Sequence, residues 1–375
     1  MSKFPVQDID IQPERLRNLL KDLVNIYSPS GKEEQILRYV ENYLKKHGLS
    51  PVRQKVDENR YNLVVFPEGR DEVDLCFVGH LDTVTAYDLD DYGFHEENDN
   101  VFGLGTADMK AACAAMIEAF VALVKRGSPL SPVGLALVVG EEEDSDGAKA
   151  LITEYGFPWA VVGEPTDMMP CLGHYGYLEV LMRTEGKRAH SSMPELGHNA
   201  IEAMLRLLIK VTDYATSFPS GLVYNIRELS GFPGGFVVPD TCEAWLDIHL
   251  PPDSRIDLLK TELEQLVEGE GIPGLDIHMR FEDTHSGYRI SQDRTLVKKL
   301  KETYQNMSLP WKPHDFRSHS DANVFWAAGV DPIILGPGRL EEAHTPEESI
   351  SFDHVVQAAQ VYLNFALSQI SLATD

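Results

Sequence analysis

The sequence has few cysteines, few basic residues and no long hydrophobic run. Its four cysteines, Cys76, Cys113, Cys171 and Cys242, form no CxxC pair, which argues against a thiolate zinc knuckle or a thioredoxin-type redox motif. We expect each to be a buried thiol in a reducing compartment. Only 33 lysines and arginines stand against 59 aspartates and glutamates, which gives a formal charge of −26 over 375 residues. This charge disfavours nucleic acids and anionic membrane surfaces as partners.

No segment of the sequence is predicted to cross a membrane. The most apolar helical stretch, residues 111–124, is short and contains Glu118, so it does not fit a membrane span. The first residues lack the basic-then-apolar order of a signal peptide. We therefore expect a cytoplasmic protein. Apolar residues make up 43% and charged residues 25% of the chain, as in folded proteins, and the length fits two domains or one large domain with an insertion.

The first part of the chain alternates apolar runs typical of buried strands with amphipathic helices. This alternation predicts an α/β domain with a mostly parallel sheet. The predicted strands are residues 62–66, 75–78, 133–139 and 159–162, and helices are predicted at 111–125 and 147–154.

The pattern changes in the middle of the chain. Strands at 177–183, 241–250 and 276–281 alternate with helices at 199–211 and 258–267. This order predicts a small α+β domain of the ferredoxin-like kind, inserted at residues 175–286. The α/β pattern then resumes with a helix at 296–304, a strand at 332–335 and a helix at 352–367. The larger α/β domain is therefore predicted to consist of residues 1–174 and 287–375.

Histidines and carboxylates recur where the predicted strands of the larger domain end, which is where open α/β sheets build their sites. Taken alone, each has an ordinary explanation, such as a polar strand end, an aspartate that begins a helix or a solvated acidic loop. Together they match the ligands of a two-metal hydrolase, and without cysteine they suit Zn²⁺, Mn²⁺ or Co²⁺. These residues are His80, Asp82, Asp108, the run Glu141–Asp144, Glu164 and His344.

The order of the motifs resembles the M20 family of dinuclear zinc hydrolases, and within it acetylornithine deacetylase and succinyl-diaminopimelate desuccinylase. The motifs are GHLDTV, GLGTADMK, the EEE run, GEPT, HSSMP and LGPG followed by AH, and they cover nearly the whole chain. The resemblance implies a catalytic domain with an inserted dimerisation or lid domain. It also implies two Zn²⁺ per subunit, with Co²⁺ or Mn²⁺ as substitutes, and a homodimer formed through the inserted domain.

The resemblance implies a role for each metal-binding residue. His80 and Glu164 are the expected terminal ligands of one metal ion, Glu143 and His344 those of the other, and Asp108 the bridging carboxylate. In this family the peptide bond after that aspartate is cis, which is rare when the next residue is not proline.

Three further residues have catalytic roles by resemblance. Asp82 is expected to orient His80. Glu142 is expected to be the general base for a hydroxide that bridges the two metal ions and attacks the amide carbon, and to pass the proton to the leaving amine. His190, from the inserted domain of a partner subunit, is expected to donate a hydrogen bond to the oxyanion. The three consecutive glutamates leave open a shift of the assignment by one residue.

The sequence departs from the family where substrate is bound. Phe236 stands where the family has asparagine, His249 where it has arginine, and Ala322-Asn323 where it has Gly-Arg. These family residues bind a substrate carboxylate, for which a bidentate arginine is hard to replace, so succinyl-diaminopimelate is disfavoured. The residues considered as replacements are His249, Arg317, His319, Ser320 and Arg339.

The sequence therefore predicts a metal-dependent amidohydrolase that removes the acyl group from an N-acyl amino acid. A di- or tripeptidase or a carboxypeptidase of the same family is the alternative enzyme, and a non-catalytic homologue that keeps the fold is the alternative from another class. A calcium-binding protein is disfavoured because no EF-hand loop is present and imidazole binds Ca²⁺ poorly.

Overall fold

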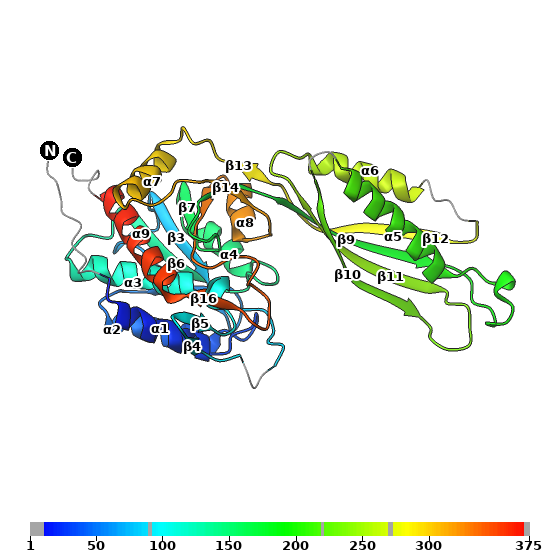
Figure 1. Ribbon diagram of the computed structural model, residues 1–375, viewed down its shortest axis with the longest axis horizontal. Coiled ribbons are helices and arrows are strands. Elements are labelled where there is room, and N and C mark those ends of the chain that lie inside the picture. Colours follow the sequence, from blue (N-terminus) through cyan, green and yellow to red (C-terminus); the bar gives the residue numbers. More distant parts are fainter. Residues whose placement is uncertain (1–10, 89–91, 219–220, 269–272, 371–375) are drawn as a thin grey trace. The chain divides into compact units, whose positions relative to one another are not determined.

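Two units make up the chain in the computed structural model, which describes residues 11–88, 92–218, 221–268 and 273–370 (Figure 1). The first unit contains Met1–Leu172, Ile290–Phe316 and Ser320–Asp375, and the second contains Gly173–Arg289 and Arg317–His319. The segment predicted as an insertion, 175–286, lies within the second unit. Residues 1–10, which carried the signal-peptide argument, lie outside the described residues.

The first unit is built on a mixed sheet with a parallel centre. Strands β6, β3, β7 and β15 are parallel neighbours in that order. Strands β2 and β1 continue antiparallel beyond β6, and β8 pairs antiparallel with β15. The bounds are β1 Val52–Lys55, β2 Tyr61–Val65, β3 Leu75–His80, β6 Val133–Val138, β7 Trp159–Val162, β8 Cys171–His174 and β15 Asp331–Ile334.

The central strands are buried on both faces, as their apolar sequences predict. Every residue of β3 and β6 is buried. Helix α3 (Ala111–Lys125) has the predicted bounds, is buried along most of its length and packs against α9 (Phe352–Ile370). Its one acidic residue, Glu118, is buried and accepts a 2.7 Å hydrogen bond from Arg15 Nε. The remaining helices are α1 Pro13–Asn25, α2 Glu34–Lys46, α4 Asp146–Glu154, α7 Thr295–Asn306 and α8 Asp321–Ala327.

Several short elements of the first unit had no counterpart in the sequence prediction. The segment Thr106–Lys110 (η1) is an irregular turn before α3. A three-stranded sheet joins β4 (His95–Glu97), β5 (Asn100–Phe102) and β16 (Ser349–Ser351), and β14 (His314–Phe316) pairs with β8. These strands are three residues long, too short to show a period of alternation.

The second unit is an antiparallel sheet of order β10-β11-β9-β12, with helices α5 and α6. Its chain order is β-α-β-β-α-β, the order of a ferredoxin-like unit. The inward side chains of β9 and β11 form its core with the apolar faces of both helices. The bounds are β9 Gly176–Glu185, α5 Ala200–Ser217, β10 Val223–Phe232, β11 Thr241–Leu250, α6 Ile256–Glu268 and β12 Asp276–His285. Two short elements complete the unit: η2 (Pro194–Leu196) in the β9–α5 connection and β13 (Tyr288–Arg289) at its end.

The cysteine and membrane expectations can be compared with the structure. All four cysteines are free and buried, as predicted. Among the residues that the structure describes, no helix is long and apolar enough to cross a membrane.

Candidate metal centre

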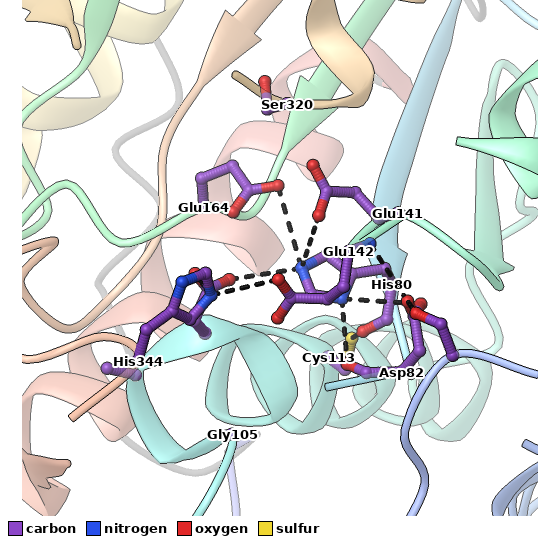
Figure 2. Close-up of polar contacts among 12 residues, drawn as sticks. His80, Asp82, Gly105, Cys113, Glu141, Glu142, Glu164, Ser320 and His344 are labelled. Atoms are coloured by element: carbon purple, nitrogen blue, oxygen red, sulfur yellow. Dashed lines mark hydrogen bonds and ion pairs between the residues drawn. The ribbon is translucent and has the colours of Figure 1, made fainter. Parts of the chain in front are cut away.

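The polar ends of the central strands meet in one cluster in the first unit, which is largely buried except for His344, whose side chain is 48% exposed (Figure 2). His80 is the last residue of β3, Glu141 and Glu142 follow β6, and Glu164 follows β7. His344 comes from the loop after β15, and Figure 2 shows its imidazole facing Glu142. Parallel strands present their carboxyl ends at the same edge of a sheet, so residues far apart in sequence converge there.

The carboxylate of Asp108 lies between two imidazoles. Its Oδ1 is 3.2 Å from His80 Nε2, and its Oδ2 is 3.4 Å from His344 Nε2. The peptide bond between Asp108 and Met109 is cis, as the resemblance implied. One carboxylate therefore has an oxygen on each side of the cluster, as a bridging ligand requires.

A residue that the sequence analysis missed holds the turn before α3. The buried carboxylate of Glu348 accepts hydrogen bonds from the backbone N–H groups of Gly105, Ala107 and Asp108, at 2.9, 2.7 and 3.0 Å. Gly105 has φ +81° and a Cβ there would lie 2.9 Å from the Thr83 side chain, so only glycine fits this position. The sequence signal for Glu348 was weak, because it is the second of two consecutive glutamates in a polar loop, four residues after His344.

Further carboxylates surround each imidazole. The Nε2 atom of His80 is 3.8 Å from Glu141 Oε2 and 3.9 Å from Glu164 Oε1. The Nε2 atom of His344 is 3.0 Å from Glu142 Oε2. All three glutamate side chains are nearly or fully buried.

The structure does not bring Glu143, a predicted ligand, into this cluster. Gly140 has φ +74° and begins a turn that Ser145 N–H closes on the Gly140 carbonyl at 2.7 Å. The turn points Glu141 and Glu142 inward and leaves Glu143 exposed. The glutamates that face the cluster are thus Glu141 and Glu142, one residue earlier in the run than the expected pair Glu142 and Glu143.

Asp82 supports His80 mainly through its backbone. The Asp82 carbonyl oxygen is 3.0 Å from His80 Nδ1, whereas its carboxylate Oδ1 is 3.7 Å away. A carbonyl can only accept, so Nδ1 donates and Nε2 points to Asp108. The other carboxylate oxygen, Oδ2, accepts from Ser30 Oγ at 2.7 Å and from Glu142 N–H at 3.1 Å. Asp82 therefore links the ends of β3 and β6.

Burial and the close contacts within the cluster shift the pKa values of its carboxylates and imidazoles. Burial raises the pKa of Glu141 and Glu164 well above the usual range, and neighbouring carboxylates raise both further. Burial alone would lower the pKa of His80, but its hydrogen bond with Asp108 and the surrounding glutamates raise it well above its usual value. The hydrogen bonds of His344 with Asp108 and Glu142 raise its pKa to about 11. Without cations, protons are what balance these carboxylates.

The donor set fits two divalent transition ions. One oxygen each of Asp82, Glu142 and Glu164 is buried and has no hydrogen-bond partner among the described residues. Single ligand atoms of His80, Asp108 and Glu142 all lie within 4.8 Å of one another. Imidazole nitrogens and carboxylate oxygens without thiolates are ligands of Zn²⁺, Mn²⁺ and Co²⁺.

Comparison with known proteins identifies the family. Residues 76–368 match the model of peptidase family M20/M25/M40. The chain belongs to the M20 family. Members of this family are hydrolases that act on amide bonds, and dinuclear metal-binding peptidases are among them. The M20 fold, with its largely parallel central sheet, therefore applies to this chain.

Individual relatives differ in the activities that their names state. A probable carboxypeptidase of Aspergillus terreus is 28% identical over 91% of this chain and 83% of its own length. An acetylornithine deacetylase of Vibrio parahaemolyticus is 28% identical over 86% of this chain and 88% of its own. The crystal structure of a tripeptidase from Staphylococcus aureus superposes with a TM-score of 0.80 at 21% identity, covering 96% of this chain and 99% of that one. A dinuclear metal-binding M20 peptidase from Bacillus subtilis has a TM-score of 0.71 at 13% identity, covering 97% and 99%.

The remaining predicted residues divide between the two units. His190, His249 and His319 belong to the second unit. His190 is exposed, and its Nδ1 is 2.8 Å from Ser192 Oγ. In the first unit, Ser320 is buried and caps α8, and Arg339 is exposed with its Nε 3.7 Å from Glu341. The catalytic role of His190 and the substrate-binding roles of the other four stay predictions.

Proposed function

We propose that this protein is a zinc-dependent amidohydrolase that removes the acyl group from an N-acyl amino acid. The observation that carries the proposal is the Asp108 carboxylate held between His80 and His344, with a further glutamate beside each imidazole. This arrangement supplies two adjacent sets of ligands that share one carboxylate.

The proposed ligands follow from these contacts. His80 and Glu164 would hold one Zn²⁺, His344 and Glu142 the other, and Asp108 would bridge them. When bound, such ions lower the pKa of water toward neutrality and polarise the amide carbonyl. Co²⁺ and Mn²⁺ are chemically acceptable substitutes at the same ligands.

Glu141 is the proposed general base. It is 8% exposed, next in sequence to ligand Glu142, and its carboxylate faces His80 rather than solvent (Figure 2). Burial raises its pKa, which suits a group that takes a proton from water and returns it to the leaving amine near neutral pH. Asp82 positions His80 and the Glu142 backbone, and His190 remains the proposed oxyanion donor.

An N-acyl amino acid is the proposed substrate class for two reasons. Acetylornithine deacetylases recur among the relatives, at 26–28% identity over 80–86% of this chain. The chain also replaces two family arginines by His249 and Asn323, which removes cations suited to a second substrate carboxylate. The proposed contacts for the N-acyl amino acid are His249, His319, Ser320 and Arg339.

An assay with zinc-loaded protein tests this proposal. N-acetylornithine and N-acetyl-lysine would be compared with the matched dipeptides Ala-ornithine and Ala-lysine and with a tripeptide. We expect release of acetate from an N-acetyl amino acid with a kcat/KM at least tenfold above that of any peptide. Turnover of the peptides alone would instead support the peptidase alternative, and no turnover of either class with metal bound would contradict the proposed reaction.

A homodimer through the second unit is the proposed assembly. Strand β10 is an edge of its sheet and exposes Val223, Ile226, Leu229 and Phe232, with side chains 38–59% exposed. An edge strand with unpaired backbone groups and apolar side chains is a template for pairing with another chain. A second copy of β10 offers the same groups, so a twofold contact between two edges satisfies both.

A further inference from the structure

A second group of metal-ligating side chains lies in the second unit. Asp283 and His285 are at the end of β12, and His319 comes from the short segment 317–319 that belongs to this unit. Asp283 and His285 are two residues apart in a strand, a spacing that projects side chains to one side. The register of β12 against β9 shifts between Phe281 and Thr284, so Asp283 lies in the irregular part of the strand.

The three side chains present their donor atoms to one point. One ligand atom from each of Asp283, His285 and His319 lies within 4.8 Å of the other two. Asp283 Oδ2 is 3.0 Å from His285 Nε2, and the rings of His285 and His319 have centroids 4.7 Å apart. Ligands about 2.0–2.2 Å from one ion are separated by roughly 3.3 Å in a tetrahedral arrangement, so small side-chain rotations bring all three into range.

His319 has a buried ring nitrogen that no hydrogen bond accounts for. Its Nε2 atom is buried and has no hydrogen-bond partner among the described residues. A buried imidazole nitrogen without a partner is costly unless something binds it. Burial, with His285 and His174 nearby, lowers the pKa of His319 to about 3, so its ring is neutral and offers a lone pair. The hydrogen bond with His285 lowers the pKa of Asp283 to about 2, so that group is an anion.

We propose that Asp283, His285 and His319 form a separate binding site for one divalent first-row transition ion, with Zn²⁺ as its probe. Two imidazoles and one carboxylate suit such ions and suit Ca²⁺ or Mg²⁺ poorly. Three protein ligands leave a fourth position for water or a ligand atom. None of these three residues is a proposed ligand of the hydrolase centre, so zinc retention at the two sites can be measured separately, although His319 is also a proposed substrate contact.

Zinc content of the metal-depleted full-length chain tests the site. Wild-type protein and the variants Asp283→Asn, His319→Gln and His278→Gln would be incubated with Zn²⁺, passed through a desalting column and analysed for zinc. His278 is a matched control because it lies exposed in the same strand. We expect Asp283→Asn and His319→Gln each to retain one zinc ion per chain fewer than the wild type, and His278→Gln to retain as many.

Two further outcomes make the test decisive. Equal zinc contents in all four proteins would overturn the site, whereas loss of the hydrolase centre would lower all four counts equally and leave their difference unchanged. Unfolding midpoints in chelator show whether each variant folds. Should His319→Gln fail to fold, His319→Cys replaces the nitrogen by a thiolate, and we expect it to retain zinc at the wild-type count, while a count lowered by one would contradict the proposal.

Discussion

The three consecutive glutamates after β6 should have three different functions, and matched substitutions can separate them. Glu142 Oε2 is 3.0 Å from His344 Nε2, Glu141 Oε2 is 3.8 Å from His80 Nε2, and Glu143 is exposed. Changing each in turn to glutamine keeps size and shape while removing the charge. The proposed roles then predict that metal content and turnover change independently.

Glu141→Gln should lose turnover and keep its metal. A positioned proton-transfer group contributes about 10²–10⁴-fold to rate, which corresponds to about 3–5 kcal/mol in the activation barrier. We therefore expect kcat to fall by at least about 100-fold, because an amide cannot take a proton from water. The zinc content should equal that of the wild type, because Glu141 is not a proposed ligand.

Glu142→Gln should lose metal first and turnover as a consequence. A neutral amide oxygen is a much weaker ligand than a carboxylate for a transition ion. We expect this variant to retain about one zinc ion per chain less than the wild type in the first unit, and to regain part of its activity at high Zn²⁺ concentration. Glu141→Gln should gain nothing from added Zn²⁺.

Glu143→Gln is the internal control and should resemble the wild type in both measurements. Zinc analysis after desalting and initial rates on an N-acetyl amino acid are sufficient assays. The reasoning would be refuted if Glu143→Gln lost metal while Glu142→Gln kept its metal and lost turnover, because that result would restore the assignment read from the sequence.

Three other substitutions test the site's support and the assembly. A Cβ on Gly336 would lie 2.0 Å from the Gly163 carbonyl oxygen and 2.5 Å from that of Glu164, so Gly336→Ala should cost about 1–3 kcal/mol of stability and lower the metal content. The control Gly234→Ala should change neither, because nothing lies within 4 Å of a Cβ there. Equal unfolding midpoints for the two variants would contradict this prediction. Burial raises the pKa of Glu348 from 4.5 to about 7 in the folded protein. In the presence of chelator, its contribution to the free energy of unfolding is therefore complete below pH 4.5 and is lost as the pH rises through 7. The unfolding midpoint should fall over that range, less steeply in Glu348→Gln, and an identical slope would exclude Glu348 as the source. Leu229→Lys on β10 should give monomers in size-exclusion chromatography with light scattering, while Val52→Lys on the edge strand β1 should leave the oligomer unchanged; dimers in both would place the interface elsewhere.

The fold was predictable from the sequence wherever buried positions recur with the regular spacing of a helix or a strand. Helix α3 and strand β11 have the predicted bounds because nearly every residue of α3 and every second residue of β11 is buried. Strand β10 was missed because all ten of its residues are exposed or half-buried. An exposed edge strand carries no alternation of apolar and polar residues, so only its pairing with β11 reveals it.

The sequence predicted which kinds of residue gather at the site, but not which of the three consecutive glutamates face it. His80, Asp108, Glu164 and His344 are each the one residue of their motif that carries its kind of ligand group, so each motif points to one residue. Glu141, Glu142 and Glu143 are chemically identical in sequence, and the turn at Gly140 decides which of them face inward. Glu348 escaped notice because its function is to accept backbone N–H groups, and backbone partners leave no mark on the sequence.

The electrostatics of the cluster explain why one sheet edge holds so many acids without disrupting the fold. Besides Asp82 on the Nδ1 side of His80, four carboxylates lie around the Nε2 atoms of the two imidazoles: those of Asp108, Glu141, Glu142 and Glu164. Two imidazolium ions cannot neutralise four anions, and burial raises the pKa of Glu141 and Glu164 accordingly. Two divalent cations supply the charge of four protons at once and allow both imidazoles to be neutral. The unusual protonation of the metal-free cluster and its fit to a pair of metal ions are therefore two consequences of the same buried charge.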